Sequence, residues 1–256
     1  MEQGDFTRLA KDYIHRTGYS RRVLGALASY LGAHREKFVV ADVGAGTGKL
    51  TEVLLDLGLR GFSVEPNDAM REEGMRLHAS REAFGWSKGT AEETGLATGS
   101  VDWVLMGSSF HWTDAPRALA EFHRILRPGG AFTALWNPRD LERNELQATI
   151  DANIQKMVPT LKRVSSGSKV HTEGIDEKLS STGHFDGVLF MEAPHEQLMD
   201  RDRYLGAWRS VNDIQAQAGA ETFQRIMTMI EGLVAKMDRI VVPYKTRAWT
   251  VHRRNT

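Results

Sequence analysis

The chain has 256 residues with 33 basic and 33 acidic side chains, and it contains no cysteine. The balanced charge argues against a protein that grips DNA or RNA, because such proteins need a basic surface. Without cysteine, disulfides, thiolate metal sites and thiol nucleophiles are excluded. No apolar run approaches the roughly 18 residues of a membrane-spanning helix, and the N-terminus does not read as a signal peptide, so we expect a cytoplasmic protein.

The most informative segment is Val-Val-Ala-Asp-Val-Gly-Ala-Gly-Thr-Gly, residues 39–48. A short run of β-branched residues that ends in glycines and precedes the amphipathic residues 50–57 predicts a strand, a tight turn and a helix. This is the first unit of a doubly wound α/β sheet. Glycines let a ligand approach the backbone, and a helix start directs amide N–H groups toward it. We therefore expect a nucleotide-like cofactor here.

The spacing of the glycines distinguishes between cofactors. A dinucleotide-binding turn has the pattern G-x-G-x-x-G, whereas Gly48 comes one residue early and Lys49 stands where that motif has glycine. The phosphate loop of nucleotide hydrolases also does not fit, because Gly48-Lys49 is followed by Leu50 instead of serine or threonine. An NAD-type oxidoreductase and a non-catalytic cofactor-binding protein remain as alternatives at this point.

A second strand is expected at residues 60–64, and an acidic residue follows it. Glu65 lies about 20 residues beyond the first glycine, where a carboxylate can accept hydrogen bonds from both hydroxyls of a ribose. Either Asn67 or Asp68 can cap the next helix, which we expect to run to about His78, and for Asp68 we favour a capping role over a role at the cofactor.

The pattern continues with an apolar strand at 101–106, a helix at about 115–125 and a strand at 131–136. Between the last two lies Pro128-Gly129-Gly130, which is expected to end the helix and to permit a positive φ at the turn. After residue 136 we expect a helix that begins near residue 138, helices at about 201–217 and 221–237, and strands at about 185–192 and 244–252.

Three motifs occur in the order that is typical of the class I S-adenosylmethionine-dependent methyltransferases, and the chain resembles that family. They are Asp42-x-Gly44-x-Gly46-x-Gly48, Ala91-Glu92-x-x-x-Leu96 and Arg124-x-Leu126-Arg127-Pro128-Gly129-Gly130. Residues 6–20 are similar to the opening of bacterial small-molecule methyltransferases of the methyltransferase-11 type, a group that includes enzymes similar to trans-aconitate methyltransferase. Thr17 and Ser20 stand where that opening has prolines. The resemblance covers about residues 6 to 140.

The resemblance implies a Rossmann-like α/β fold. The expected sheet has seven mostly parallel strands with a reversed last strand, helices on both faces and a helical cap. The expected parts are an N-terminal helical lid at 1–35, a cofactor-binding core at 36–140 and the C-terminal part of the same domain at 141–256. The last part is expected to hold cap helices at about 139–180 and 200–240 and closing strands at about 187–192 and 244–252.

The resemblance also implies the reaction, which is in-line transfer of a methyl group from S-adenosyl-L-methionine to O or N of a small molecule by a monomer or homodimer. Asp42 and the glycine turn would hold the methionine portion, and Glu65 the ribose. A lid from the N-terminal segment would cover the methionine carboxylate. The implied cofactor-binding residues are Tyr13, Arg16, Tyr19, Asp42, Gly44, Ala45, Gly46, Gly48, Glu65, Pro66, Asn67, Met70, Ala91, Glu92, Gly107, Ser108 and Trp112.

His111 is the candidate catalytic residue, because it follows the fourth strand, and open α/β sheets bind ligands beyond the carboxyl ends of their strands. An imidazole there can act as a general base, or His111 and Trp112 can form a wall of the cofactor site. The segment 107–114 does not resemble the Asp/Asn-Pro-Pro-Tyr motif of DNA methyltransferases, which argues against a nucleic-acid substrate. We expect no metal, since the later histidines lack ligand spacing.

Methionines are concentrated in the C-terminal third of the chain. They can line an adaptable substrate pocket or pack in an ordinary core, and the helical spacing of 226, 229, 230 and 233 favours the core. The methionines concerned are Met157, Met191, Met199, Met227, Met229 and Met237.

Overall fold

The computed structural model describes residues 7–162 and 172–255, and the chain divides into two compact units. The two units are named here the sheet unit and the helical unit. The sheet unit comprises Gly18–Asn137, Ser166–Ala193 and Thr246–Thr256, and the helical unit comprises Met1–Thr17, Pro138–Ser165 and Pro194–Lys245.

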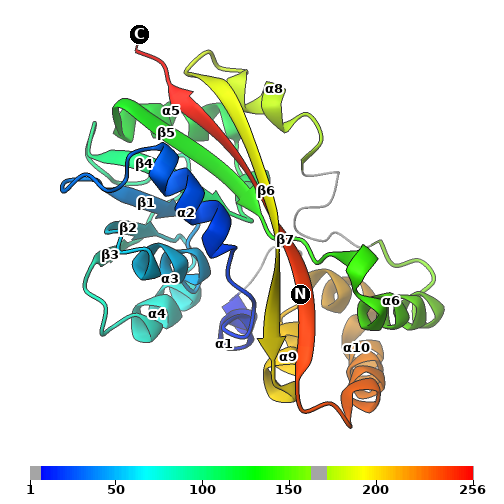
Figure 1. Ribbon diagram of the computed structural model, residues 1–256. Coiled ribbons are helices and arrows are strands. Elements are labelled where there is room, and N and C mark those ends of the chain that lie inside the picture. The colour runs from blue at the N-terminus through cyan, green and yellow to red at the C-terminus, as the bar shows by residue number, and fades with distance from the viewer. Residues whose placement is uncertain (1–6, 163–171, 256) are drawn as a thin grey trace. The chain divides into compact units, whose positions relative to one another are not determined.

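A seven-stranded sheet forms the framework of the sheet unit (Figure 1), in the order β3-β2-β1-β4-β5-β7-β6. Neighbouring strands from β3 to β5 are parallel, and β7 is antiparallel to β5. This confirms the Rossmann-like fold with a reversed last strand. The strands are β1 (Val40–Val43), β2 (Gly61–Val64), β3 (Phe84–Ser87), β4 (Val101–Gly107), β5 (Leu126–Trp136), β6 (Phe185–Met199) and β7 (Ile240–Arg253).

Helices cover both faces of this sheet because its central strands are apolar on both sides. Along β5, Phe132 and Ala134 join one core cluster, whereas Ala131 and Leu135 join the other. The first cluster includes side chains of α5 (Ala115–Ile125) and α8 (Ile175–Ser180), and the second includes those of α2 (Arg21–Tyr30) and α3 (Lys49–Asp56). The remaining described helical elements here are α4 (Asp68–Leu77) and the 3₁₀ turn η2 (Phe110–Trp112).

The helical unit has a hydrophobic core of its own. Ile150 of α6, Trp208 of α9 and Ile226 of α10 are fully buried in it, and Val242 of β7 belongs to the same cluster. α10 contains a kink at Gly219, whose φ of 75° is not helical. The elements are η1 (Thr7–Leu9), α1 (Ala10–Tyr13), η3 (Leu141–Arg143), α6 (Glu145–Met157), α9 (Arg201–Arg209) and α10 (Asn212–Val234).

The two units divide the chain at other positions than the expected parts, whose roles as lid, core and cap stay a prediction. The expected lid at 1–35 is split, because residues up to Thr17 belong to the helical unit while α2 packs on the sheet. The expected cap region at 139–180 is also split, since α8 contributes to the core of the sheet unit. Part of that region, residues 163–171, lies outside the described residues. The helix expected to begin near residue 138 begins at Glu145.

Both closing strands are longer than the expected 187–192 and 244–252. β6 continues through Pro194 to Met199, and β7 begins at Ile240 and contains Pro243. Proline has no N–H group, so a strand tolerates it where no neighbouring strand needs that donor. This condition is met on β6, which is an edge strand of the sheet. No strand was expected at Phe84–Ser87, because four residues that include a glycine show little of the alternation of apolar and polar residues that predicts a strand.

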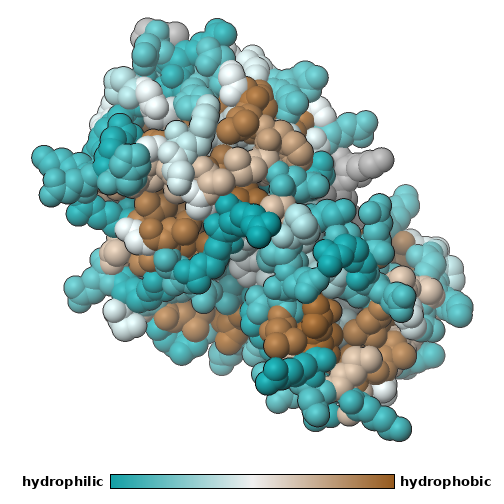
Figure 2. All heavy atoms as spheres, in the orientation of Figure 1, coloured by the Kyte–Doolittle hydropathy of each residue, from teal (hydrophilic) through white to brown (hydrophobic). Residues whose placement is uncertain are grey.

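Large apolar side chains are exposed at several places on the surface. Figure 2 shows a largely hydrophilic face that is interrupted by smaller apolar patches. Trp112, Leu141 and Phe190 are among the large apolar side chains that are exposed. Within residues 7–162 and 172–255, no helix combines the length and apolarity that crossing a membrane requires.

Gly61 in β2 is predicted to be essential for the pairing of β2 with β1. A Cβ atom at this position would lie 1.8 Å from the backbone oxygen of Val40, so Gly61→Ala must push the two strands apart. We expect the free energy of unfolding to fall by about 1–3 kcal/mol, the usual cost of overpacking. Urea unfolding followed by circular dichroism measures this change.

Gly85→Ala is the matched control, because the nearest atom to its added Cβ is Cδ1 of Phe62 at an ordinary 3.7 Å. We expect this variant in the adjacent strand to unfold close to the wild-type midpoint. Equal midpoints for the two variants would contradict the proposed strand contact.

Candidate functional site

Asp42 is a buried acidic residue near the carboxyl end of β1. Its side chain is 1% exposed, and Oδ2 accepts a 2.6 Å hydrogen bond from the hydroxyl of Thr51 in α3. A further 2.8 Å contact joins this hydroxyl to that of Ser63 in β2. Oδ1 is buried without a hydrogen-bond partner among the described residues. Burial raises the pKa of Asp42 to about 7, against the lowering effect of the bonds from Thr51, and Glu65 raises it further.

The glycine turn that follows β1 is held to the end of β2 by its backbone. The N–H groups of Gly44 and Ala45 donate to the carbonyl oxygen of Val64 at 2.8 and 3.1 Å. Positive φ angles of 70°, 58° and 84° occur at Gly44, Gly46 and Gly48, where residues with a Cβ would be strained. The acidic-glycine motif therefore forms a compact, backbone-lined turn.

Glu65 connects this turn to the start of α4. Its Oε2 accepts a 2.8 Å hydrogen bond from the Gly46 N–H, and its Oε1 accepts one of 2.9 Å from the Asn67 N–H. The residue is 7% exposed, and burial raises the pKa of its carboxyl, although these two bonds and the charge of Arg71 oppose the shift. Each carboxylate oxygen has two lone pairs, so both can accept a further donor.

The cap of α4 is one of the two residues that the sequence offered. The side chain of Asn67 accepts the N–H of Met70 at 3.1 Å and is the N-cap, whereas Asp68 is the first helical residue. Asn67 is therefore confirmed as the cap, and a capping role for Asp68 is wrong. Met70 is buried, and its methyl group lies 3.3 Å from the Cβ position of Gly46, while Pro66 is exposed.

The loop with the Ala91-Glu92 motif is tied to α5. Glu92 Oε1 accepts a 2.8 Å hydrogen bond from the backbone N–H of Asp114, the N-cap of α5. Ala91 is buried in the core cluster on that face of the sheet. The expected role of these two residues in binding the cofactor is not tested by these interactions and stays a prediction.

At the carboxyl end of β4 the structure brings together three of the predicted site residues. Tyr19 and Ser108 form a 3.1 Å hydrogen bond between their hydroxyls, and a Cβ on Gly107 would lie 2.6 Å from the Tyr19 hydroxyl. Ser108 has a positive φ of 57° and donates its N–H to Leu135 in β5. Backbone strain of this kind in a non-glycine residue is enriched at functional sites.

His111 lies in η2, directly after this strained segment. The indole N–H of Trp136, the last residue of β5, donates to Nδ1 of His111 across 3.3 Å. Because an indole can only donate, Nδ1 carries no proton in this arrangement, and the neutral ring has its proton on Nε2. Trp112 packs against His111 and is 52% exposed. This geometry favours a wall or hydrogen-bond donor over a general base.

Tyr13 and Arg16 belong to the helical unit. The guanidinium of Arg16 donates to the hydroxyl and carbonyl oxygens of Ser210 at 2.8 and 2.9 Å and lies over the Tyr13 ring. These interactions stabilise the helical unit, and the expected role of both residues at the cofactor stays a prediction.

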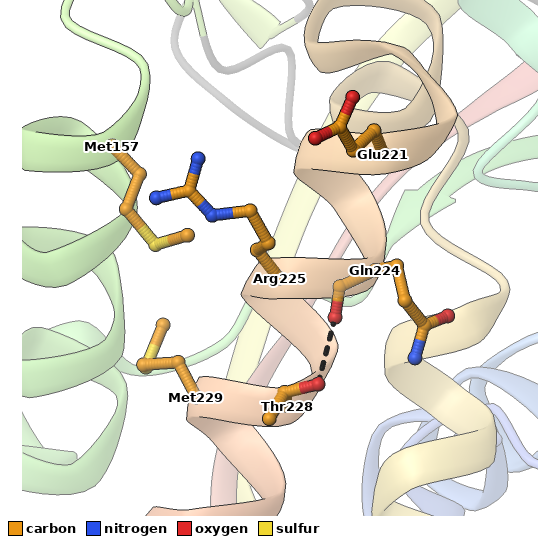
Figure 3. A pocket seen from close by; sticks show the side chains of 6 residues that line it. All are labelled: Met157, Glu221, Gln224, Arg225, Thr228 and Met229. Atoms are coloured by element: carbon orange, nitrogen blue, oxygen red, sulfur yellow. Dashed lines mark hydrogen bonds between the residues drawn. The ribbon is translucent and has the colours of Figure 1, made fainter.

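A pocket of about 640 Å³ lies on the helical unit between α6 and α10, as Figure 3 shows. Of the six methionines singled out from the sequence, Met157 and Met229 line it. Met199 and Met227 are buried in the core, Met191 packs in the sheet unit, and Met237 is exposed. The pocket is lined by Met157, Glu221, Gln224, Arg225, Thr228 and Met229.

Two residues behind Asp42 were not expected from the sequence, namely Thr51, which donates to the carboxylate, and Ser63, which contacts the Thr51 hydroxyl. Both are fully buried in short, otherwise largely apolar segments. Each hydroxyl stands at a position where the spacing of the apolar residues predicts a buried side chain. Because buried polar groups are usually hydrogen-bonded, this position could have identified both residues as partners of another buried polar group. Among the described residues, no cluster of three or more metal-ligating side chains is present.

Comparison with known proteins agrees with this geometry. Residues 41–134 match a family model described as a methyltransferase domain. An uncharacterized methyltransferase of Schizosaccharomyces pombe is 30% identical over 189 residues, which cover 71% of this chain and 69% of that protein. An uncharacterized methyltransferase of Mycobacterium tuberculosis is 45% identical over 101 residues, and the chain spans only 40% of the length of that relative.

Solved structures show the same fold. A protein described as a type II methyltransferase from Anaeromyxobacter dehalogenans has a TM-score of 0.61 at 21% identity, with 93% of this chain and 97% of that chain covered. Phosphoethanolamine N-methyltransferase 2 of Haemonchus contortus, in complex with S-adenosyl-L-methionine, has a TM-score of 0.53 at 15% identity, with 96% and 57% covered. The chain belongs to the class I S-adenosylmethionine-dependent methyltransferase family.

The raised pKa of Asp42 predicts how stability depends on pH. Between about pH 4 and 7 the folded protein keeps a proton on this side chain that the unfolded chain has lost, so its stability falls as pH rises. Asp42→Asn removes this penalty and can still accept from Thr51. We expect the variant to gain stability relative to wild type from pH 4 to pH 8, by up to about 4 kcal/mol at about 1.4 kcal/mol per pKa unit.

Urea unfolding at several pH values measures the difference. Asp68→Asn is the control, because Arg71 and Lys88 lower the pKa of this exposed carboxyl and its pH trend has the opposite sign. Parallel stability curves for wild type and Asp42→Asn over this range would show that Asp42 titrates normally.

The hydrogen bond from Trp136 predicts the tautomer of His111. In protein labelled with ¹⁵N-histidine, we expect the ring nitrogens of neutral His111 to report a proton on Nε2 and none on Nδ1. The His111→Gln variant assigns the signals by their loss. A proton on Nδ1 would restore Nε2 as a basic nitrogen and return His111 to the role of general base.

Proposed function

We propose that this enzyme binds S-adenosyl-L-methionine at the glycine turn and transfers its methyl group to O or N of a small molecule. One observation carries the proposal, namely that the turn after β1 is anchored through Gly46 to the buried carboxylate of Glu65. A backbone-lined turn beside a paired acidic residue matches the methionine and ribose portions of this cofactor. The solved fold neighbour from Haemonchus contortus, which holds S-adenosyl-L-methionine, supports the same cofactor here.

The residues present fit a cationic ligand. Asp42 and Glu65 are both buried acids whose ionised forms are disfavoured by burial, and Asp42 has an oxygen without a partner among the described residues. A positively charged group placed near them would stabilise both carboxylates. The pyrophosphate of a dinucleotide would do the reverse, so this electrostatic environment disfavours the oxidoreductase alternative.

The cofactor supplies a methyl group on a positively charged sulfur, which makes it reactive without further activation. The chain then needs to position the two reactants and exclude water, and positioning alone can supply several kcal/mol. We assign Glu65 to the ribose, and Asp42 with the turn to the methionine portion. Tyr19, Gly107 and Ser108 form a wall beside the end of β4, and His111 orients the acceptor as a hydrogen-bond donor.

Several finer parts of the proposal rest on the family resemblance. The small-molecule acceptor, the transfer to O or N, a cytoplasmic location and a monomeric or homodimeric state are expectations for this chain.

Binding of S-adenosylhomocysteine tests the role of Glu65. Charge-assisted hydrogen bonds contribute about 1.5–3 kcal/mol each, so we expect Glu65→Ala to weaken this ligand at least about tenfold in calorimetry. Asp68→Ala, which removes an exposed carboxylate three residues later, is expected to leave the affinity unchanged.

Circular dichroism checks that Glu65→Ala remains folded, because this variant also loses the bonds to Gly46 and Asn67. Wild-type affinity in a folded Glu65→Ala protein would remove Glu65 from the site. Heat released with NADH and none with S-adenosylhomocysteine would overturn the cofactor itself.

A further inference from the structure

His78 is a partly buried histidine at the C-terminal end of α4, and the proposed mechanism gives it no role. Its ring lies directly against the third glycine of the turn after β1. A Cβ atom placed on Gly48 would lie 2.5 Å from Nε2 and 2.7 Å from Cδ2 of His78. Because real Cβ atoms do not approach other atoms so closely, the imidazole and the glycine backbone are in direct packing contact.

Trp86 of β3 supports the other side of this imidazole. The two rings are stacked, with their centroids 6.1 Å apart and their planes inclined by 12°. Trp86 also packs on Gly74, one turn earlier in α4, where its ring leaves no room for a Cβ, and its Cη2 would lie 3.2 Å from a Cβ on Gly48. A ring packed in this way has little freedom to move, so His78 and Trp86 together form a rigid wall behind the glycine turn.

The peptide between Thr47 and Gly48 is engaged on both of its sides. Its N–H group, which is that of Gly48, donates to the carbonyl oxygen of Ala45 at 2.9 Å. Its carbonyl oxygen, which is that of Thr47, accepts a hydrogen bond from the ring of His78. Because a peptide is planar and its N–H and C=O groups point in opposite directions, the two bonds together keep the plane from rotating. Gly48 has a φ of 84° and no side chain, so this peptide would otherwise rotate easily.

The ring of His78 is uncharged at neutral pH. Burial lowers its pKa, and the charges of Lys49 and Arg81 act in the same direction. The charge of Glu52 and the bond to Thr47 oppose this shift but do not reverse it. The neutral imidazole still has the one N–H that the Thr47 carbonyl requires, and it adds no positive charge behind the turn.

We propose that His78 is a positioning residue, which fixes the glycine turn in the conformation that receives the cofactor. The turn makes the contacts with the ligand, and His78 acts through the turn. Preorganisation of this kind increases affinity, because the ligand does not have to order the backbone when it binds. The inference deepens the proposed function and rests on it for the identity of the ligand, whereas the hold on the turn is a property of the ligand-free protein.

Two variants of similar shape separate the hydrogen bond from the packing. Glutamine and methionine side chains are both unbranched and about equally long, but only His78→Gln retains an N–H donor for Thr47. We expect His78→Met to weaken S-adenosylhomocysteine about threefold to tenfold in calorimetry, which is the effect of one hydrogen bond, and His78→Gln to stay within about twofold of wild type. His34→Met changes an exposed histidine of the same unit and is the control, with unchanged affinity expected.

Hydrogen exchange followed by NMR measures the hold on the turn without any ligand. We expect the Gly48 amide to exchange at least about threefold faster in His78→Met than in wild type, and His78→Gln to restore its protection. Urea unfolding shows whether the variants are folded. Trp86→Phe, which loosens the wall and keeps His78, covers the case in which His78→Met does not fold, and we expect it to change affinity and exchange in the same direction.

The two proposals fail in different ways. If S-adenosylhomocysteine binds to wild type and equally well to His78→Met and His78→Gln, the cofactor site stands and this inference is wrong, whatever the exchange of Gly48. Equal exchange of the Gly48 amide in these two variants would also overturn it. If S-adenosylhomocysteine binds to none of the proteins, the proposed function is wrong, and the exchange of Gly48 alone decides whether His78 holds the turn.

Discussion

Two buried carboxylates beside the turn after β1 are the constraint on which the sheet unit depends. Asp42 accepts from the hydroxyl of Thr51, which in turn contacts Ser63, and Glu65 accepts from the backbone N–H groups of Gly46 and Asn67. Burial disfavours the charged form of both acids, and Glu65 adds to the upward pKa shift of Asp42. Burying two acids together lowers stability, and the positively charged cofactor of the proposed function would offset this cost.

Much of the sheet unit could be predicted from sequence because its signals are local. A β-branched run followed by glycines at fixed spacing specifies β1, its turn and α3 within some fifteen residues, and Gly129 has the positive φ expected of its turn. The edges of the sheet lacked such signals. β3 is too short for its period to be recognised, and β6 continues past Pro194 because an edge strand does not need every N–H donor. The missed strand β3 and the underestimated length of β6 both depend on where these strands lie in the sheet. Local residue patterns do not contain that information.

The candidate site was predictable only in part for a related reason. Tyr19 and Ser108 could each be named from motifs, but their hydroxyl contact depends on how residues 89 positions apart meet in the fold.

The hydrogen bond at His111 bears on which acceptors of the proposed reaction would need a base. The Nδ1 of His111 is already engaged by Trp136, which leaves the proton of the neutral ring on Nε2. An alcohol or an ammonium group must lose a proton before it can attack a methyl group, whereas a nucleophile that is ionised at neutral pH needs no base. A nucleophile of the second kind therefore fits the observed state of His111 better than one that depends on this ring to remove its proton.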